Sequence, residues 1–119
     1  MKFYKQLIDE KGGTDKGEIM KVASAIETEM QKQGIRYSDD SFEKVADNHV
    51  VELSTRAVRG DMLKDSDNPY DPAQVTSDSW NKATEVKEAL EKDFGIKLTG
   101  IETFLLSTHF MINSQEAGK

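Results

Sequence analysis

The chain has two histidines, His49 and His109, and each lies among apolar residues at helical spacing. Around each, apolar side chains recur at intervals of three and four, as they do along the inward face of a helix. The apolar positions are Phe42, Val45, Ala46, Val50, Leu53 and Ala57 around the first, and Ile101, Phe104, Leu105 and Ile112 around the second. An imidazole can act as an acid, a base, a nucleophile or a metal ligand near neutral pH. The two histidines are therefore the first candidate site.

Arg56 lies seven residues after His49, on the same edge of the predicted helix. A guanidinium can donate two parallel hydrogen bonds to an anion such as phosphate. We therefore interpret Arg56 as a residue that could support a phosphate near the histidines.

Three other interpretations stay open at this stage. The histidines could be structural, within a helical domain that serves only for protein interaction. They could also bind a metal together with Glu52 and Glu102 in a small bundle, although the repeated Glu-x-x-His pairs of di-metal bundles are absent. Acid–base catalysis is the third, but no nucleophile elbow, phosphate loop or cofactor fingerprint accompanies the histidines. We therefore expect a non-enzymatic protein without cofactor or metal.

Start and stop signals delimit the helices that carry these residues. Capping boxes, in which an Asp or Thr is followed three residues later by a Glu, occur at Asp15–Glu18 and Thr99–Glu102. Glycines suited to helix ends follow at Gly34, Gly60 and Gly95. The helices predicted from these signals and from the apolar spacing span residues 16–33, 39–60, 79–94 and 99–113.

The remaining segments complete one all-α domain over residues 16–115. Residues 1–15 are expected to form an N-terminal arm or a short helix, and 116–119 a tail. The polar stretch 61–78 holds both prolines and is long for a connection, so we expect a short helix within it. No segment alternates like a strand, which favours a compact helical bundle. Its core should include Phe42, Val45, Leu53, Ile101, Phe104 and Leu105.

A short internal repeat suggests how the histidines are arranged. GIRYS at 34–38 parallels GIKLT at 95–99, and a histidine follows 11 residues after Ser38 and 10 after Thr99. Each copy links the end of one helix to the start of a histidine-bearing helix. Two similar helix pairs packed with approximate symmetry would bring His49 and His109 together.

Composition describes a charged globular domain. The chain has 119 residues, a net charge of −6, 36% hydrophobic and 32% charged residues, and no cysteine. The acidic balance argues against direct nucleic-acid binding, and no apolar run is long enough for a membrane span. We expect a cytoplasmic protein.

Three runs resemble the phosphotransferase-system regulation domain (PRD). VADNHVVELSTRAVRGDML at 45–63 is similar to that domain's second-helix signature, with a His and an Arg seven positions later. FGIKLTGIETFLLSTHF at 94–110 resembles its final helix, and NPY at 68–70 resembles the start of its middle loop. The resemblance covers one copy, over about 18–115, and we expect a module without an attached effector domain.

The resemblance implies a stand-alone, antiterminator-like regulatory module with a five-helix bundle of two antiparallel helix pairs plus a short connecting helix. In this family, histidines accept phosphoryl groups from the carrier HPr or a sugar-specific IIB component, and dimer rearrangement then regulates transcription or a partner protein. The resemblance also implies that His49 and His109 are the phosphoacceptors, that Arg56 is the nearby cation, and that the protein forms a homodimer.

Overall fold

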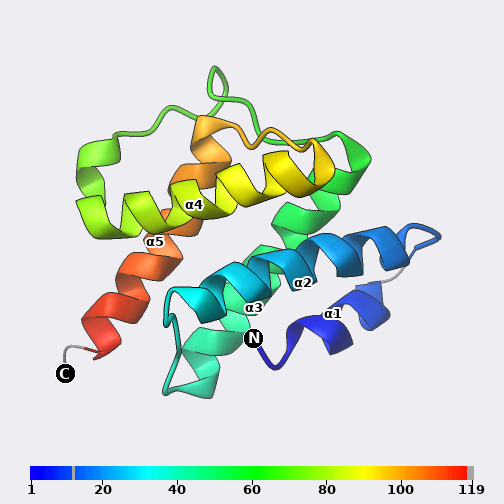
Figure 1. The fold of residues 1–119 in the computed structure, drawn as a ribbon, viewed down its shortest axis with the longest axis horizontal. Helices are drawn as coiled ribbons and strands as arrows, with labels where there is room; N and C mark the ends of the chain where they lie inside the picture. Colours follow the sequence, from blue (N-terminus) through cyan, green and yellow to red (C-terminus); the bar gives the residue numbers. More distant parts are fainter. Residues whose placement is uncertain (12, 118–119) are drawn as a thin grey trace.

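The computed structural model describes residues 1–11 and 13–117, with side chains described up to residue 112. It contains five α-helices and one 3₁₀ helix, and no strand is present in the described residues (Figure 1). They are α1 (Tyr4–Lys11), α2 (Lys16–Lys32), α3 (Asp40–Arg59), η1 (Pro72–Gln74), α4 (Ser77–Phe94) and α5 (Gly100–Ala117). The predicted all-α fold is confirmed. The fifth α-helix is α1, whereas the helix expected in the middle stretch is only the three-residue η1.

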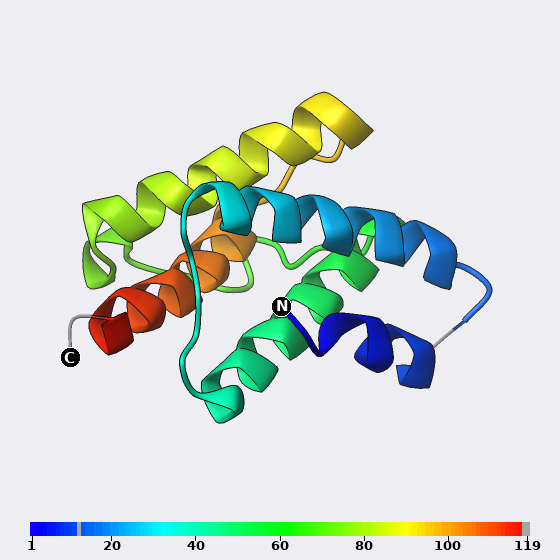
Figure 2. The ribbon, with the colours of Figure 1, turned by 60° about the horizontal axis from the view of Figure 1, so that its bottom comes forward.

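The helices form two consecutive hairpins. The chain reverses direction from α2 to α3 and again from α4 to α5, and α2 and α4 lie side by side across the other two (Figures 1 and 2). The short helix α1 packs against α3 and α2. This arrangement places α3 and α5 against each other with opposite directions, which positions the two histidine-bearing helices side by side.

Local capping explains several helix ends. Gly60 and Gly95 end α3 and α4 in the left-handed conformation, with φ of 67° and 68°, which favours glycine. At the other ends, Asp39 accepts a hydrogen bond from the Ser41 amide, and Thr76 accepts one from the Ser79 amide. Side-chain caps and terminal glycines therefore delimit the same helices that the sequence predicts.

One capping prediction is wrong. Asp15 precedes α2 but makes no side-chain cap. Its carboxylate oxygens instead accept hydrogen bonds from Arg59 Nε at 2.9 Å and Nη2 at 3.2 Å. A charged pair between the start of α2 and the end of α3 thus replaces the expected local cap.

The core forms two adjoining clusters. The larger one joins all five α-helices, and its fully buried members include Ile8, Ile26, Leu53, Leu90, Leu106 and Phe110. The smaller one packs Val75, Ile101 and Phe104 under the middle stretch, where the Tyr70 ring lies 5.2 Å from that of Phe104. Leu53, Ile101 and Phe104 are therefore buried as predicted.

Other predicted core residues lie at the surface. Phe42 and Val45 are 48% and 61% exposed, and Ile112, which the apolar spacing places on the inward face of the last helix, is 37% exposed. Leu105 is only half-buried, whereas its neighbour Leu106 is fully buried. The apolar spacing continues along α3 and α5, but the start of α3 and the later part of α5 extend past the neighbouring helices, so the apolar residues there are exposed to solvent.

Candidate functional site: a histidine pair and a buried ion pair between α3 and α5

The two histidines lie together between α3 and α5. The centroids of the His49 and His109 rings are 4.6 Å apart, and the ring planes are inclined by 30°. Both residues are half-buried, so each keeps part of its surface exposed. The approach expected from two symmetrically packed helix pairs is present in the structure.

Both imidazoles are in an environment that favours the neutral form. Burial, with smaller contributions from the neighbouring His109 and the Arg56 charge, lowers the pKa of His49 to about 3. Burial also lowers the pKa of His109. Buried Nε2 of His49 has no hydrogen-bond partner, and no described carboxylate pairs with either ring. The pair is therefore neutral at pH 7.

A neutral imidazole pair of this kind can supply a nucleophilic nitrogen or a metal ligand. The residues around the pair argue against a catalytic triad and against a metal site. No described carboxylate orients either ring, as the Asp of a Ser-His-Asp triad would. Glu52, one of the candidate metal ligands, accepts a hydrogen bond from Asn48 at 3.0 Å and lies 4.0 Å from Lys11 Nζ. Among the described residues, no three His, Asp or Glu side chains converge in a way that could hold a metal ion.

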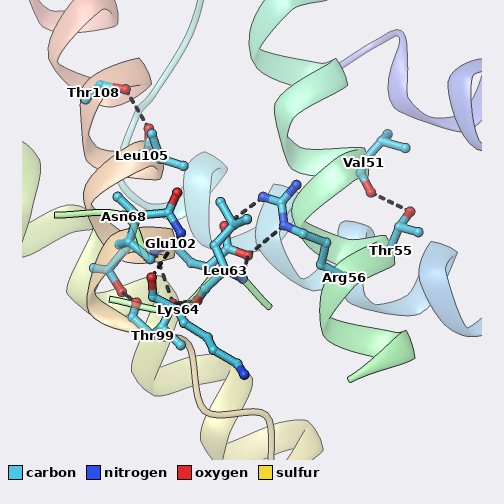
Figure 3. A network of polar contacts seen from close by, with 12 residues as sticks. Val51, Thr55, Arg56, Leu63, Lys64, Asn68, Thr99, Glu102, Leu105 and Thr108 are labelled. Carbon is cyan, nitrogen blue, oxygen red and sulfur yellow. Dashed lines mark hydrogen bonds and ion pairs between the residues drawn. The ribbon is translucent and has the colours of Figure 1, made fainter. Parts of the chain in front are cut away.

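Arg56 and Glu102 form a second contact between the same two helices. Arg56 donates from Nε and Nη2 to the two carboxylate oxygens of Glu102, each at 2.7 Å (Figure 3). The Glu102 side chain is 0% exposed and that of Arg56 is 21% exposed. The hydrogen bonds to Glu102 raise the pKa of Arg56. The guanidinium predicted to support a phosphate is thus bound to a buried carboxylate.

Glu102 also holds the segment that follows α3. Its carboxylate accepts a hydrogen bond from the Leu63 amide at 3.3 Å, and Thr99 donates to the Leu63 carbonyl at 2.8 Å (Figure 3). The Ile101 amide at the start of α5 donates to Asp65 at 2.7 Å. We name this group the Arg56–Glu102 clasp, because it joins α3, residues 61–65 and the start of α5.

The clasp corrects the predicted role of Glu102 as a cap. The Glu102 amide is within 3.4 Å of the Thr99 hydroxyl, which is half of a capping box. The other half is missing, since the Glu102 side chain points to Arg56 rather than back to the start of the helix. Glu102, which the sequence places in a local capping box, therefore makes a long-range contact with Arg56 instead.

The His49–His109 and Arg56–Glu102 contacts are separated by the same number of residues on the antiparallel helices α3 and α5. Arg56 lies seven residues after His49, and Glu102 lies seven residues before His109. Seven residues are about two helical turns, or ~11 Å along the axis. The buried side chains of Leu53 and Leu106 occupy the intervening part of the two helices. The mirrored spacing is the sequence signal that could have identified Glu102 as the partner of Arg56.

No protein-family model, curated protein or solved structure matches the chain. None of the described helices is both long and apolar enough to cross a membrane. The functional assignment therefore rests on the geometry of α3 and α5 and on the sequence resemblance.

Proposed function

We propose that this chain acts as a regulatory module that is phosphorylated on His49 and His109 by the sugar phosphotransferase system. The observation that carries the proposal is the imidazole pair, whose ring centroids lie 4.6 Å apart. The resemblance to the PRD family supplies the phosphoryl donors, HPr or a sugar-specific IIB component, and the cytoplasmic setting. The module is non-enzymatic and controls transcription or a partner protein through rearrangement of a dimer.

The state of the histidines supports phosphoryl acceptance. A neutral ring nitrogen has the free electron pair that attacks phosphorus, and the lowered pKa values keep both rings neutral. In the transfer, the bond from phosphorus to the donor side chain, which is an N–P bond in HPr, breaks with its electron pair staying on the donor as a new N–P bond forms on the acceptor ring. The added group carries a charge of about −1.5 to −2, by analogy with phosphorylated hydroxyls. Such a charge beside a second neutral imidazole would change how the two helices pack.

Exposed apolar residues beside the histidines support a contact with a second copy. Phe42 and Val45 precede His49 on the same edge of α3, and both are largely exposed. Ile112 follows His109 by three residues on α5 and is also exposed. Exposed apolar surface of this kind commonly marks an interaction site. Phosphorylation next to it would add negative charge between two copies that each already carry −6.

The same surface also favours a second candidate function, a helical protein-interaction domain in which the histidines are structural. The specific observation in its favour is that Nε2 of His49 is buried, so that a phosphoryl donor cannot reach this nitrogen in the structure described. In that case a different protein would cover Phe42 and Val45, and neither ring would accept phosphate.

Phosphotransfer separates the two candidates. The purified protein is incubated with phosphoenolpyruvate, enzyme I and HPr, and in parallel with a IIB component, and intact mass is measured without acid. We expect the mass increase of a phosphoryl group, reduced in His49→Ala and in His109→Ala and absent from the double variant. No transfer from either donor, or transfer that survives in the double variant, would overturn the proposed function.

Sedimentation tests the proposed dimer. We expect a dimer that Phe42→Ser weakens, whereas Phe94→Ser, at a 40% exposed position on α4, serves as the matched control. His49→Asp and His109→Asp should shift the equilibrium more than the corresponding Ala variants, because they place a negative charge at the rings. A monomer at every concentration would contradict dimer-based control.

A further inference from the structure

The two histidines of the pair differ in how far solvent reaches their ring nitrogens. Nε2 of His49 is buried and has no hydrogen-bond partner, whereas no nitrogen of His109 is among the buried, unpartnered side-chain atoms of the described residues. The hydrogen bond that Tyr37 donates to His109, at 3.1 Å, goes to the backbone carbonyl and not to the ring. Although both residues are half-buried, the more reachable nitrogens are therefore those of His109.

Protonation does not distinguish the two rings. The pKa of each imidazole is lowered by burial, so both rings are neutral at pH 7 and each has one nitrogen with a free electron pair. That pair lies in the plane of the ring, at the nitrogen itself, so a reagent must reach the nitrogen and not merely the ring face. A difference in reaction rate between His49 and His109 at pH 7 would thus measure access.

A second phosphoryl group on the pair would meet strong repulsion from the first. The ring centroids lie 4.6 Å apart, and each phosphoryl group carries about −1.5 to −2 charge, by analogy with phosphorylated hydroxyls. Arg56, the cation two turns away on α3, donates to both carboxylate oxygens of Glu102 at 2.7 Å and is engaged there. A second group therefore requires the two rings to move apart.

We infer that the two histidines accept phosphoryl groups in a fixed order, His109 first and His49 only after α3 and α5 have separated at the rings. The inference rests on the proposed function and adds the order of the two acceptors to it. In the first step, a His109 nitrogen bonds to phosphorus while the donor keeps the electron pair of the broken bond. The proton on the other ring nitrogen then passes to solvent, so the ring itself stays neutral.

Diethyl pyrocarbonate tests the difference in access without any component of the phosphotransferase system. A neutral ring nitrogen bonds to the ethoxycarbonyl carbon, ethyl carbonate leaves, and peptide masses locate the modified histidine. At pH 7, with less than one modification per chain, His109 should react at least about tenfold faster than His49, because His49 reacts only in molecules where α3 and α5 have opened locally. Urea below the unfolding transition should raise the rate at His49 much more than at His109.

Two matched variants test the order in the phosphotransfer itself. His49→Phe and His109→Phe each keep an aromatic ring at the position but remove its nitrogens. With phosphoenolpyruvate, enzyme I and the donor that phosphorylates the wild type, His49→Phe should take up one phosphoryl group at the wild-type initial rate. His109→Phe should take it up at least about tenfold more slowly, since His49 needs the local opening. In the wild type, partial phosphorylation should appear on the His109 peptide first.

The outcomes separate this inference from the proposed function. Transfer to the wild type with His49 labelled first, or with His109→Phe labelled at the wild-type rate, would overturn the order and leave the proposed function standing. Diethyl pyrocarbonate reacting with His49 as fast as with His109 would also overturn the order. No transfer to the wild type from HPr or IIB would overturn both. If circular dichroism shows that His109→Phe does not fold, the peptide masses of the wild type decide.

Discussion

Truncating Arg56 to Ala should remove a large part of the stability of the domain. The guanidinium makes two 2.7 Å hydrogen bonds to Glu102, whose side chain is 0% exposed. Without Arg56, the carboxylate would keep, among the described residues, only the Leu63 amide at 3.3 Å as a donor. Removing one partner of a buried ion pair costs about 3–5 kcal/mol. Because domains of this kind are stable by only about 5–15 kcal/mol, the loss should be easily measured.

The exposed pair Arg59–Asp15 provides the matched control. It has the same two-hydrogen-bond geometry between a guanidinium and a carboxylate, but its side chains are 50% and 24% exposed. Exposed ion pairs contribute about 0–1 kcal/mol. Arg59→Ala should therefore lower the free energy of unfolding much less than Arg56→Ala does, and the contrast between the two variants isolates the effect of burial.

Urea unfolding followed by circular dichroism and by the fluorescence of Trp80 measures these differences. Arg56→Lys should fall between wild type and Arg56→Ala, because lysine keeps the charge but not the planar fork. The double variant Arg56→Met with Glu102→Leu should regain most of the loss, since an apolar pair can replace a buried ion pair at little cost. An Arg56→Ala loss as small as that of Arg59→Ala would refute the reasoning, as would a double variant that loses the sum of both single changes.

Three further predictions follow from burial and pKa. Leu106→Ala, at a fully buried position, should lower the free energy of unfolding by about 2–5 kcal/mol, and Leu105→Ala, at a half-buried one, by clearly less; equal losses in urea unfolding would contradict the observed phase of α5. Asp47 has a pKa raised to about 6 in the fold against ~4 unfolded, so it destabilises the fold above pH 6 and this penalty fades as the pH falls toward 4. Relative to Asp47→Asn, the wild type should gain up to about 3 kcal/mol over that range, and parallel stability curves for the two proteins would refute this assignment. His49, with a pKa of about 3, should show no change in its imidazole NMR signals between about pH 8 and about pH 5. The effect of His49 on stability is opposite to that of Asp47: below ~6.5 the unfolded state takes up a proton that the folded state does not, so the free energy of unfolding falls as the pH falls. A titration midpoint near ~6.5 for the His49 imidazole would show an exposed ring.

The helices were predictable from sequence because their signals are local. Gly60 and Gly95 end α3 and α4 where the sequence places the stops, since only a local left-handed turn is needed there. The inward faces were less predictable. Apolar spacing shows that Phe42 and Val45 share an edge with His49, but it does not show where the neighbouring helices stop. Phe42, Val45 and Ile112 therefore deviate at the outer ends of α3 and α5, whereas Leu105 deviates within α5, where its neighbour Leu106 is the fully buried residue.

Polar partners were the least predictable part of the site. Asp15 and Glu102 each occupy a position in a predicted capping box. Each pairs instead with an arginine far away in sequence. From the sequence alone, a carboxylate at such a position is equally compatible with a local helix cap and with a long-range ion pair. Only the packing of α2 and α5 against α3 decides between them.

The two contacts between α3 and α5 differ in strength, and this difference bears on the proposed function. The Arg56–Glu102 clasp is charged, buried and bonded to residues 61–65, so it fixes one end of the helix pair. Two turns away, His49 and His109 are neutral, partly exposed and not hydrogen-bonded to each other. Beyond them lie the exposed Phe42 and Ile112. A charge added to either ring would therefore act at the end of the helix pair that has no ion pair among the described residues, and the proposed rearrangement would begin there while the clasp keeps the other ends together.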